Sequence, residues 1–458
     1  MVTFCVRRQL LLRKERTVWL ELLQCRGCTN AGAALDETDH MGTLMKLCCD
    51  RHYIAHDHDS PKCIRRGSSW TYGPLGMELR KNILDQWWSS VVTTRPQVFG
   101  INTLHGFRGG SGAPERTLKL IDTEALHQAL HQAEMTGKSK GDALQKLLQG
   151  SVSMRTNLLQ GALEQYVASL ELVNRKLAFG LAETGLCYQL PEDQPGELDC
   201  SPSEVLQASL VWFCSPRTSS QWLDYWARQR LQWWRKFALS PSSFSCSDVT
   251  VGEEGENMKR GVKVLYQFPW GSEALETLCN LGNTELLQIH IGSQAKLQCR
   301  DGKRSVVPHV ISVSGNIDRG LLAYLHNSLQ EVKKVDSRQR QHMRKVLKLH
   351  PSLTPVKVAV NMGKGATSDL RQVCEGLLQE LLDGGISSWP GYLENMSPSL
   401  EQLKYDEMGV LFTVVISDST LESGLVQLRS RDTTIKETMH ISEVKNFLAK
   451  YIAAAENV

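Results

Sequence analysis

The sequence contains no uninterrupted apolar run approaching the roughly 20 residues that a bilayer-spanning helix needs, so no membrane contact is expected. It also has little net charge, because 52 Lys and Arg residues stand against 49 Asp and Glu residues, a formal balance of +3. A balance this small excludes a broad basic field, and any nucleic-acid surface must be local. With 41% apolar and 22% charged residues over 458 positions, the chain can bury a large core.

Disulfide and zinc patterns are weak. Thirteen cysteines are an odd number spread over a long chain, which indicates mostly reduced thiols in an intracellular compartment. One CxxC occurs, at Cys25 and Cys28, whereas a strong zinc signal needs a second pair. The cysteines near Cys48 fit the apolar side of a helix running to Arg51 instead. We therefore expect no metal site.

Glycine-rich phosphate loops are missing too. The glycines of residues 106–112 lack the spacing of a dinucleotide fingerprint and indicate a flexible linker. Gly363-Lys364-Gly365 is not a P-loop, because Val358 stands where that motif requires a glycine. We expect no cofactor.

Residues 1–40 form an N-terminal segment that is rich in arginine and poor in acid, with Glu15 as its first acidic residue. This composition is typical of a mitochondrial transit peptide. An ordinary basic tail has the same composition, so both interpretations stay open.

Residues 121–177 contain no proline and one aromatic residue, Tyr166. Six residues from Leu159 to Leu177 follow heptad spacing, which predicts a long amphipathic helix. An earlier helix capped by Asp122 would complete a hairpin. This helix could pack on its own domain, or the hairpin could project and pair with a second copy as a homodimer. The candidate dimer residues are Leu159, Leu163, Tyr166, Leu170 and Val173.

Two segments combine features of nucleic-acid binding. Residues 205–240 interleave five tryptophans with basic residues, which could stack on bases. Tryptophans in the core behind a solvated basic face explain the pattern better. Residues 333–350 hold seven basic residues against one acid, Asp336, and either bind double-stranded DNA or form a solvated helix face. The candidate DNA-binding residues are Lys333, Lys334, Arg338, Arg340, Arg344 and Lys345.

Hydrophobic patterns predict an α/β (α+β) chain. Strands are expected at 262–266, 286–291 and 306–313, followed by a helix at 317–329. Pro351 and Pro355 mark a boundary, after which 352–458 reads as a compact α/β module. Its expected strands are 356–360, 410–416 and 424–431, and its helices are 369–382 and 441–453.

Several of these blocks resemble class II aminoacyl-tRNA synthetases of the glycyl type. Thr71 to Gly76 and the helix that ends in Trp87-Trp88 resemble motif 1, and Pro308 to Arg319 resembles motif 3. Residues 356–360, 405–409 and 428–433 resemble the anticodon-binding domain of that family. The resemblance implies a synthetase-like antiparallel sheet domain at 41–345 with the helical hairpin 121–177 inserted, then an anticodon-binding-like domain at 352–458.

Motif 2 departs from the synthetase pattern. Gln189 stands where the arginine that holds the ATP α-phosphate belongs, and Pro191 replaces the glutamate. Adenylate formation develops negative charge in its transition state, so loss of a fixed cation there should cost several kcal/mol. We expect no enzymatic activity and no catalytic residues.

This combination of blocks resembles the accessory subunits of mitochondrial DNA polymerases. The resemblance implies a homodimer in the mitochondrial matrix, at the nucleoid, that binds the catalytic subunit and double-stranded DNA and raises processivity. The candidate polymerase-binding residues are Gly424, Arg429 and Arg431. An active glycyl- or histidyl-type synthetase and a tRNA-sensing pseudo-synthetase remain as alternatives.

Overall fold

The computed structural model describes residues 34–55, 70–108, 118–131, 137–189, 203–251, 259–335, 341–365 and 367–456. The arginine-rich start and the CxxC lie outside the described residues. The chain divides into two units, Met1–Thr43 and Leu44–Val458, and the elements described below lie in the second, except for the start of one helix. Helix α2 (Ala34–Asp50) begins in the first unit and ends in the second. Among the described residues, no helix is long and apolar enough to cross a membrane.

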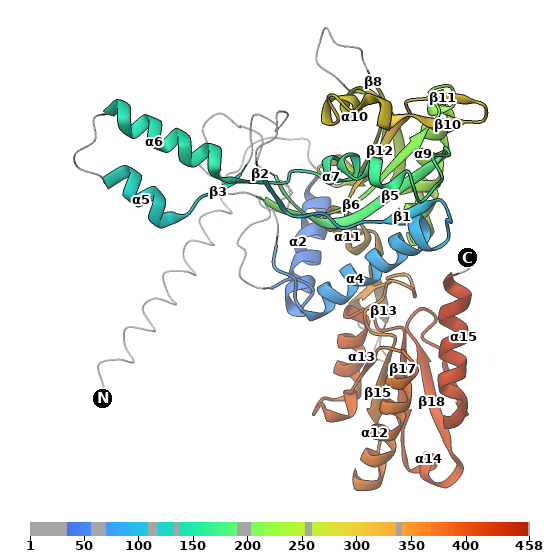
Figure 1. Ribbon diagram of the computed structural model, residues 1–458. Coiled ribbons are helices and arrows are strands. Elements are labelled where there is room, and N and C mark those ends of the chain that lie inside the picture. Colours follow the sequence, from blue (N-terminus) through green and yellow to red (C-terminus); the bar gives the residue numbers. More distant parts are fainter. Residues whose placement is uncertain are drawn as a thin grey trace. The chain divides into compact units, whose positions relative to one another are not determined.

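A seven-stranded sheet forms the centre of the second unit, and Figure 1 shows its strands. All neighbouring strands are antiparallel except β1 and β5, as expected for a synthetase-like domain. In sheet order the strands are β1 (Val98–Gly100), β5 (Phe179–Gln189), β6 (Ser203–Cys214), β12 (His309–Asn316), β9 (Gly271–Gly282), β8 (Lys259–Phe268) and β7 (Phe244–Val251).

Helices cover both faces of this sheet. Trp212 of β6 packs on Trp226 of α9 (Ser219–Lys236), with ring centroids 5.4 Å apart. The next residue, Phe213, packs on Tyr166 of α8 (Tyr166–Ser169), at 4.6 Å. Since successive residues of a strand point to opposite faces, α9 and α8 lie on opposite sides. Helix α7 (Leu159–Glu164) contacts β5 and β6 beside α8.

The predicted motif 1 helix is confirmed as α4 (Pro74–Trp88), which continues as the π-helical turn η1 (Ser89–Thr93). Its predicted apolar face is buried, from Leu75 to Trp87. Pro74 occupies the first turn, where its missing N–H costs no hydrogen bond. Helix α4 packs against α11 (Ile317–Ser328), the helix predicted after motif 3.

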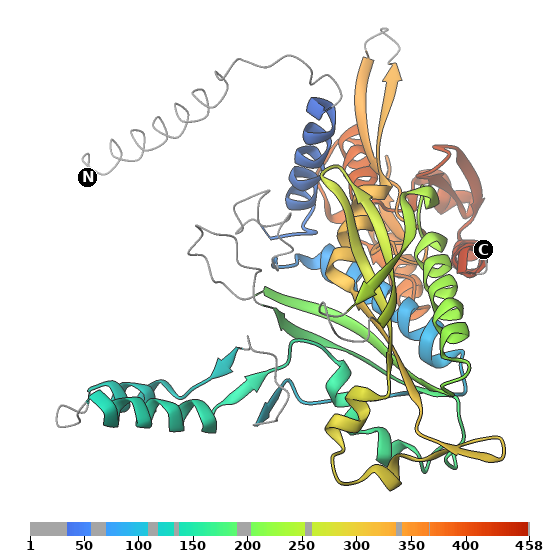
Figure 2. The ribbon, with the colours of Figure 1, turned by 90° about the horizontal axis from the view of Figure 1, so that it is seen from above.

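The helical hairpin is shorter than predicted. Helices α5 (Thr123–His131) and α6 (Gly137–Gly150) pack on each other and extend away from the large sheet (Figure 2). They leave from a small sheet ordered β2 (Gly106–Arg108), β4 (Val152–Met154), β3 (Lys119–Leu120), so Gly106 belongs to a strand rather than a linker. The Asp122 carboxylate caps α5 by accepting the backbone N–H of Glu124, at 2.8 Å.

Three predictions about local structure are wrong. Residues 159–177 do not form one long helix, because α7 and α8 end by Ser169. The expected strand at 286–291 is helix α10 (Thr284–Ile289), which is followed by η3 (Gln294–Leu297) and the hairpin of β10 (Cys299–Asp301) and β11 (Arg304–Val306). The basic segment is not a helix face but a hairpin of β13 (Leu329–Val335) and β14 (Gln341–Leu347).

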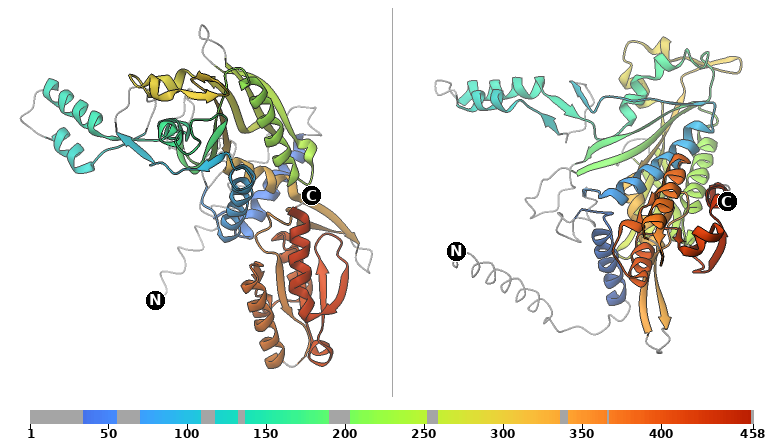
Figure 3. Two further views of the ribbon diagram at one scale, coloured as in Figure 1. Left: turned by 45° about the vertical axis from the view of Figure 1, so that its right-hand side comes forward. Right: turned by 90° about the horizontal axis from the view of Figure 1, so that it is seen from below.

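The C-terminal module is confirmed as α/β. Its sheet order is β16 (Ser388–Trp389), β15 (Val358–Met362), β17 (Phe412–Ile416), β18 (Leu425–Ser430) and β19 (Lys436–His440). Figure 3 shows α12 (Thr367–Asp383) and α15 (Val444–Glu456) against this sheet, and both contribute buried residues to its core. The shorter elements are η4 (Gly391–Leu393), α13 (Pro398–Glu407), α14 (Asp418–Ser423) and η5 (Ile441–Glu443).

Candidate functional site

The synthetase-like motifs meet at the carboxylate of Asp318, in the first turn of α11. It accepts the hydroxyl of Tyr72 at 2.7 Å and the backbone N–H of Leu206 on β6 at 2.7 Å. It also forms an ion pair with Arg80 of α4, Nε–Oδ1 2.9 Å. Burial, followed by the charge of Asp318, raises the pKa of Tyr72 well above its usual value. This junction holds the motif 1 helix, β6 and the motif 3 helix together.

A buried ion pair lies over strand β5. Arg155 Nη1 lies 2.9 Å from Glu183 Oε1, and the exposed fraction of Glu183 is 2%. The guanidinium also donates to the carbonyl oxygens of Leu186 and Thr103. A Cβ at Gly185 would lie 2.0 Å from Arg155 Nη2, so only glycine permits this approach. The charge is matched within the fold, and breaking such a pair costs several kcal/mol.

Among the described residues, the positions that correspond to motifs 2 and 3 of a synthetase do not provide two free arginines for ATP. Gln189 is the last residue of β5 and is exposed, while Leu190 and Pro191 lie outside the described residues. Arg319 of motif 3 forms an ion pair with Glu273, at 2.8 Å. Burial lowers the pKa of Arg319. The motif 2 position therefore supplies no cation, and the motif 3 arginine is already matched by a carboxylate.

The predicted dimer seam belongs to the core of its own domain, which corrects that assignment. Leu163, Tyr166 and Leu170 are at most 1% exposed, and Leu159 and Val173 pack against the same core cluster. The Tyr166 hydroxyl donates to the Leu297 carbonyl at 2.9 Å. The helices that do project are α5 and α6, where Leu130 and Leu148 are each 45% exposed.

The basic segment keeps only part of its candidate surface. Arg344 forms a buried ion pair with Asp406, so its charge is not free for DNA, and this assignment is corrected. Lys345 is half-buried opposite Glu331, and Lys333 and Lys334 belong to β13. Arg338 and Arg340 lie outside the described residues.

Two of the three candidate polymerase contacts, Arg429 and Arg431, are buried, which corrects that part of the prediction. Arg429 is 6% exposed and pairs with Asp406, at 3.2 Å. Arg431 is 3% exposed and donates to the carbonyl oxygens of Leu347, Gly409 and Leu349. Gly424 ends α14 with a φ of 69°, in the left-handed region that favours glycine. All three residues hold strand β18 and its connections in place.

The tryptophan-rich segment is core, as expected, since Trp226, Trp233 and Trp234 of α9 are buried. The sequence reasoning missed Arg230, which is 2% exposed and pairs with Glu276 at 3.0 Å. One signal could have found it. Trp226, Arg230 and Trp233 follow an i, i+4, i+7 spacing, which places the arginine on the apolar face of the helix.

Comparisons with known proteins agree with this geometry. A family model described as an anticodon binding domain matches residues 356–451. The chain is 49% identical over 441 residues to the DNA polymerase subunit gamma-2, mitochondrial, of Xenopus laevis, covering 94% of this chain and 91% of the relative. It is 50% identical to the DNA polymerase subunit gamma-2 of Mus musculus, with 91% of each covered. The chain belongs to the DNA polymerase subunit gamma-2 family.

Membership in the gamma-2 family makes the chain a mitochondrial polymerase subunit of the accessory kind on a synthetase-like fold. The glycine–tRNA ligase of Thermobifida fusca (strain YX) is also similar, at 25% identity over 91% of this chain and 99% of the relative. The motifs and the anticodon-binding-like domain reflect that more distant relationship. The active-synthetase alternative is therefore set aside.

Proposed function

We propose that this chain is the non-catalytic processivity subunit of the mitochondrial DNA polymerase, acting as a homodimer in the matrix, at the nucleoid. It binds the catalytic subunit and double-stranded DNA and needs no cofactor. The observation that carries the proposal is 49–50% identity to gamma-2 subunits over more than nine-tenths of the chain. Gln189 in place of the motif 2 arginine supports a role without adenylate chemistry.

For the homodimer, the α5–α6 hairpin replaces the seam first predicted. Its helices pack on each other, and Leu130 and Leu148 each expose nearly half of their side chains at its surface. Exposed leucines on a projecting element favour contact with another protein surface. A second copy offers the same hairpin, which suits a two-fold contact.

For the catalytic subunit, the exposed apolar residues around α13 are better candidates than Arg429 and Arg431. Lys404 lies over the Trp389 ring and bonds to Glu394, so the segment before α13 packs beside this helix. Apolar side chains here are between 37% and 55% exposed, a pattern that suits a polymerase contact. They are Leu393, Met396, Leu400 and Leu403.

For DNA, the β13–β14 hairpin remains the candidate surface. Its candidate cations are Lys333, Lys334, Arg338, Arg340 and Lys345 by sequence, while Arg344 is paired with Asp406. Non-specific duplex binding needs phosphate contacts and no reading of base edges. About five neutralised phosphates predict a slope of log affinity against log salt near −4 to −5.

The test measures duplex binding at several salt concentrations and the product length of the catalytic subunit on primed DNA. In the variant with Arg338, Arg340 and Lys345 all changed to Ala, we expect the slope of log affinity against log salt to become less negative by about 2 to 3. The DNA products of the catalytic subunit should also become shorter. Lys303→Ala with Arg304→Ala on the β10–β11 hairpin removes exposed cations elsewhere and should change neither. An unchanged slope in the triple variant would place the DNA surface elsewhere.

Transfer RNA is the competing ligand, because residues 356–451 match an anticodon binding domain. The same titration with duplex DNA as the labelled ligand and tRNA as the competitor separates the two. Displacement by tRNA well below the concentration at which unlabelled duplex displaces would favour the tRNA-sensing alternative. Equal or weaker displacement supports the replication role, since phosphate contacts alone do not distinguish the two ligands.

A further inference from the structure

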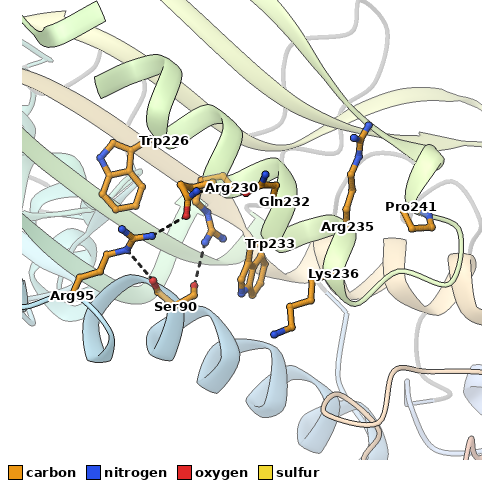
Figure 4. Close-up of a pocket in the computed structure, with 10 residues that line it drawn as sticks. Ser90, Arg95, Trp226, Arg230, Gln232, Trp233, Arg235, Lys236 and Pro241 are labelled. Atoms are coloured by element: carbon orange, nitrogen blue, oxygen red, sulfur yellow. Dashed lines mark hydrogen bonds between the residues drawn. The ribbon is translucent and has the colours of Figure 1, made fainter. Parts of the chain in front are cut away.

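A cavity of about 550 Å³ lies between η1 and the C-terminal half of α9 (Figure 4). Four of its lining side chains are cationic, namely Arg95, Arg230, Arg235 and Lys236. The other described lining residues are neutral, and none is a carboxylate. Glu276 matches one of these charges, that of Arg230, and the other three form a local excess in a chain whose net charge is only +3. The volume falls within the range of small-molecule sites.

The charge of Arg95 is held in place by neutral groups. Its Nε donates to the Ser90 carbonyl at 3.1 Å, and its two terminal nitrogens donate to Tyr225 Oη at 2.6 Å and Gln229 Oε1 at 3.2 Å. None of these partners carries a charge. The guanidinium is therefore oriented by the fold but not neutralised by these contacts, as in a site prepared for an anion.

Arg230 is deeply buried yet incompletely bonded. Its Nε lies 3.0 Å from both oxygens of Glu276, and Nη1 donates weakly to Ser90 Oγ at 3.4 Å. Its Nη2 has no hydrogen-bond partner among the described residues, and neither does the indole N–H of Trp226. Buried donors are normally satisfied, so the unpaired Nη2 leaves Arg230 with an unused donor in the wall of the cavity.

We propose that this cavity binds a di- or triphosphate group, carried by a nucleotide or present as free pyrophosphate. Phosphate oxygens are acceptors only, and arginine forks match their geometry. The cations around a cavity of about 550 Å³ outnumber the roughly two negative charges of one phosphate group. Two or three linked phosphates match the cavity better in both charge and size.

Recognition goes through the phosphates rather than a base. The Arg95 guanidinium covers the Trp226 ring at 4.7 Å, and that of Arg230 covers Trp233 at 4.4 Å. One face of each indole is thus occupied by a cation, and both tryptophans are buried. We therefore expect ATP, dATP and GTP to bind alike. Since α9 covers the face of the sheet opposite to Tyr166, the cavity is separate from the Arg155–Glu183 pair over β5.

The test is calorimetric titration of the full chain at low salt with pyrophosphate, ATP, GTP, orthophosphate and adenosine. We expect saturable binding of the polyphosphates, weaker binding of orthophosphate and none of adenosine. Arg235→Gln with Lys236→Gln, both exposed positions, should weaken polyphosphate binding about tenfold, or 1.4 kcal/mol. Arg95→Gln should do the same. Pyrophosphate binding as tightly as ATP identifies free diphosphate as sufficient, and tighter ATP identifies a nucleotide.

The matched control is Arg228→Gln, which removes one exposed cation from the same helix outside the cavity lining. It should change affinity by less than about twofold, as expected for a screened surface charge. The proposal is overturned by an absence of saturable polyphosphate binding, by equal losses in the control and the double variant, or by tight binding of adenosine. It is also overturned if the double variant loses affinity for short duplex DNA by the same factor as for polyphosphate, because the cations then belong to a DNA surface.

Discussion

Two leucine-rich segments, α5–α6 and α7–α8, follow similar spacing rules and have opposite surroundings. In α5–α6 the helices pack on each other, and Leu148 remains 45% exposed. In α7–α8 Leu163 and Tyr166 are at most 1% exposed beneath the large sheet. This difference shows that sequence periodicity identifies the apolar face of a helix. It does not identify which part of the protein, if any, packs against that face.

The cover for α7–α8 comes from distant strands. Tyr166 packs on Phe213 with centroids 4.6 Å apart, and Phe213 packs on Phe179 at 5.1 Å. These aromatic rings of β5 and β6 provide the large buried area that two short helices need, because helices of this length are marginal alone. No comparable ring is present in the described residues of α5 and α6.

Replacing Tyr166 by Ala should lower stability more than any other change proposed for this chain. A small effect would contradict the contrast between the buried α7–α8 pair and the exposed α5–α6 pair. Deleting a buried aromatic ring leaves a cavity and should lower the free energy of unfolding by about 3–5 kcal/mol. Tyr166→Phe keeps the ring and loses only the bond to Leu297, about 1 kcal/mol. Urea unfolding followed by circular dichroism measures both. Equal losses in the two variants would show that the ring does not anchor this core.

The pH dependence of stability provides a test at His350, which lies outside both helix pairs. Burial, then the charges of Lys236, Lys357 and Arg431, lowers the pKa of His350 to about 4. Because the unfolded imidazole titrates near 6.5, the unfolded state binds more protons between these values. Stability should be constant above about pH 6.5 and fall by up to about 3 kcal/mol as the pH drops to 4.

Unfolding at several pH values checks this, and His350→Gln should flatten the decline. Gln keeps a polar acceptor for the Ser352 N–H, which donates to His350 Nδ1 at 3.2 Å. The decline should persist without α5–α6, since His350 packs on Phe237 of the sheet domain. If the His350→Gln variant lost the same stability between pH 6.5 and 4, the decline would arise from other titrating groups.

Removing residues 122–150 should have the smallest effect on folding. Leu120 pairs with Val152 across the antiparallel strands β3 and β4, so the two ends are adjacent and a short Asn-Gly turn can join them. We expect the free energy of unfolding to change by less than about 1 kcal/mol, while self-association weakens strongly. Analytical ultracentrifugation measures the association. An unchanged dimer, or an intact chain that is already monomeric at micromolar concentration, would contradict the proposed hairpin contact.

Sequence reasoning succeeded where local pattern and burial coincide. The apolar face of α4, the helix after motif 3 and the α/β alternation after Pro355 were all predicted. It failed where a distant residue decides the outcome. Arg344 and Arg429 looked like free surface cations because Asp406, far from Arg344 in sequence, is their shared partner.

The same limit explains the remaining errors. Residues 286–291 carry a strand-like apolar pattern, but the chain turns at Asn283 after β9 and begins a helix at Thr284. The Arg230–Glu276 pair joins a helix to a strand 46 residues away, and no local rule couples these two positions. Motif resemblance predicted the synthetase-like fold class because it compares whole blocks of sequence.

The Asp406 carboxylate also links two parts of the molecule. It binds Arg344 of β14 and Arg429 of β18, so one buried group joins the basic hairpin to the C-terminal sheet. Arg431 adds bonds to the carbonyls of Leu347 and Leu349, just where β14 ends. We expect the base of the hairpin and the C-terminal sheet to move together, because these bonds link the two elements.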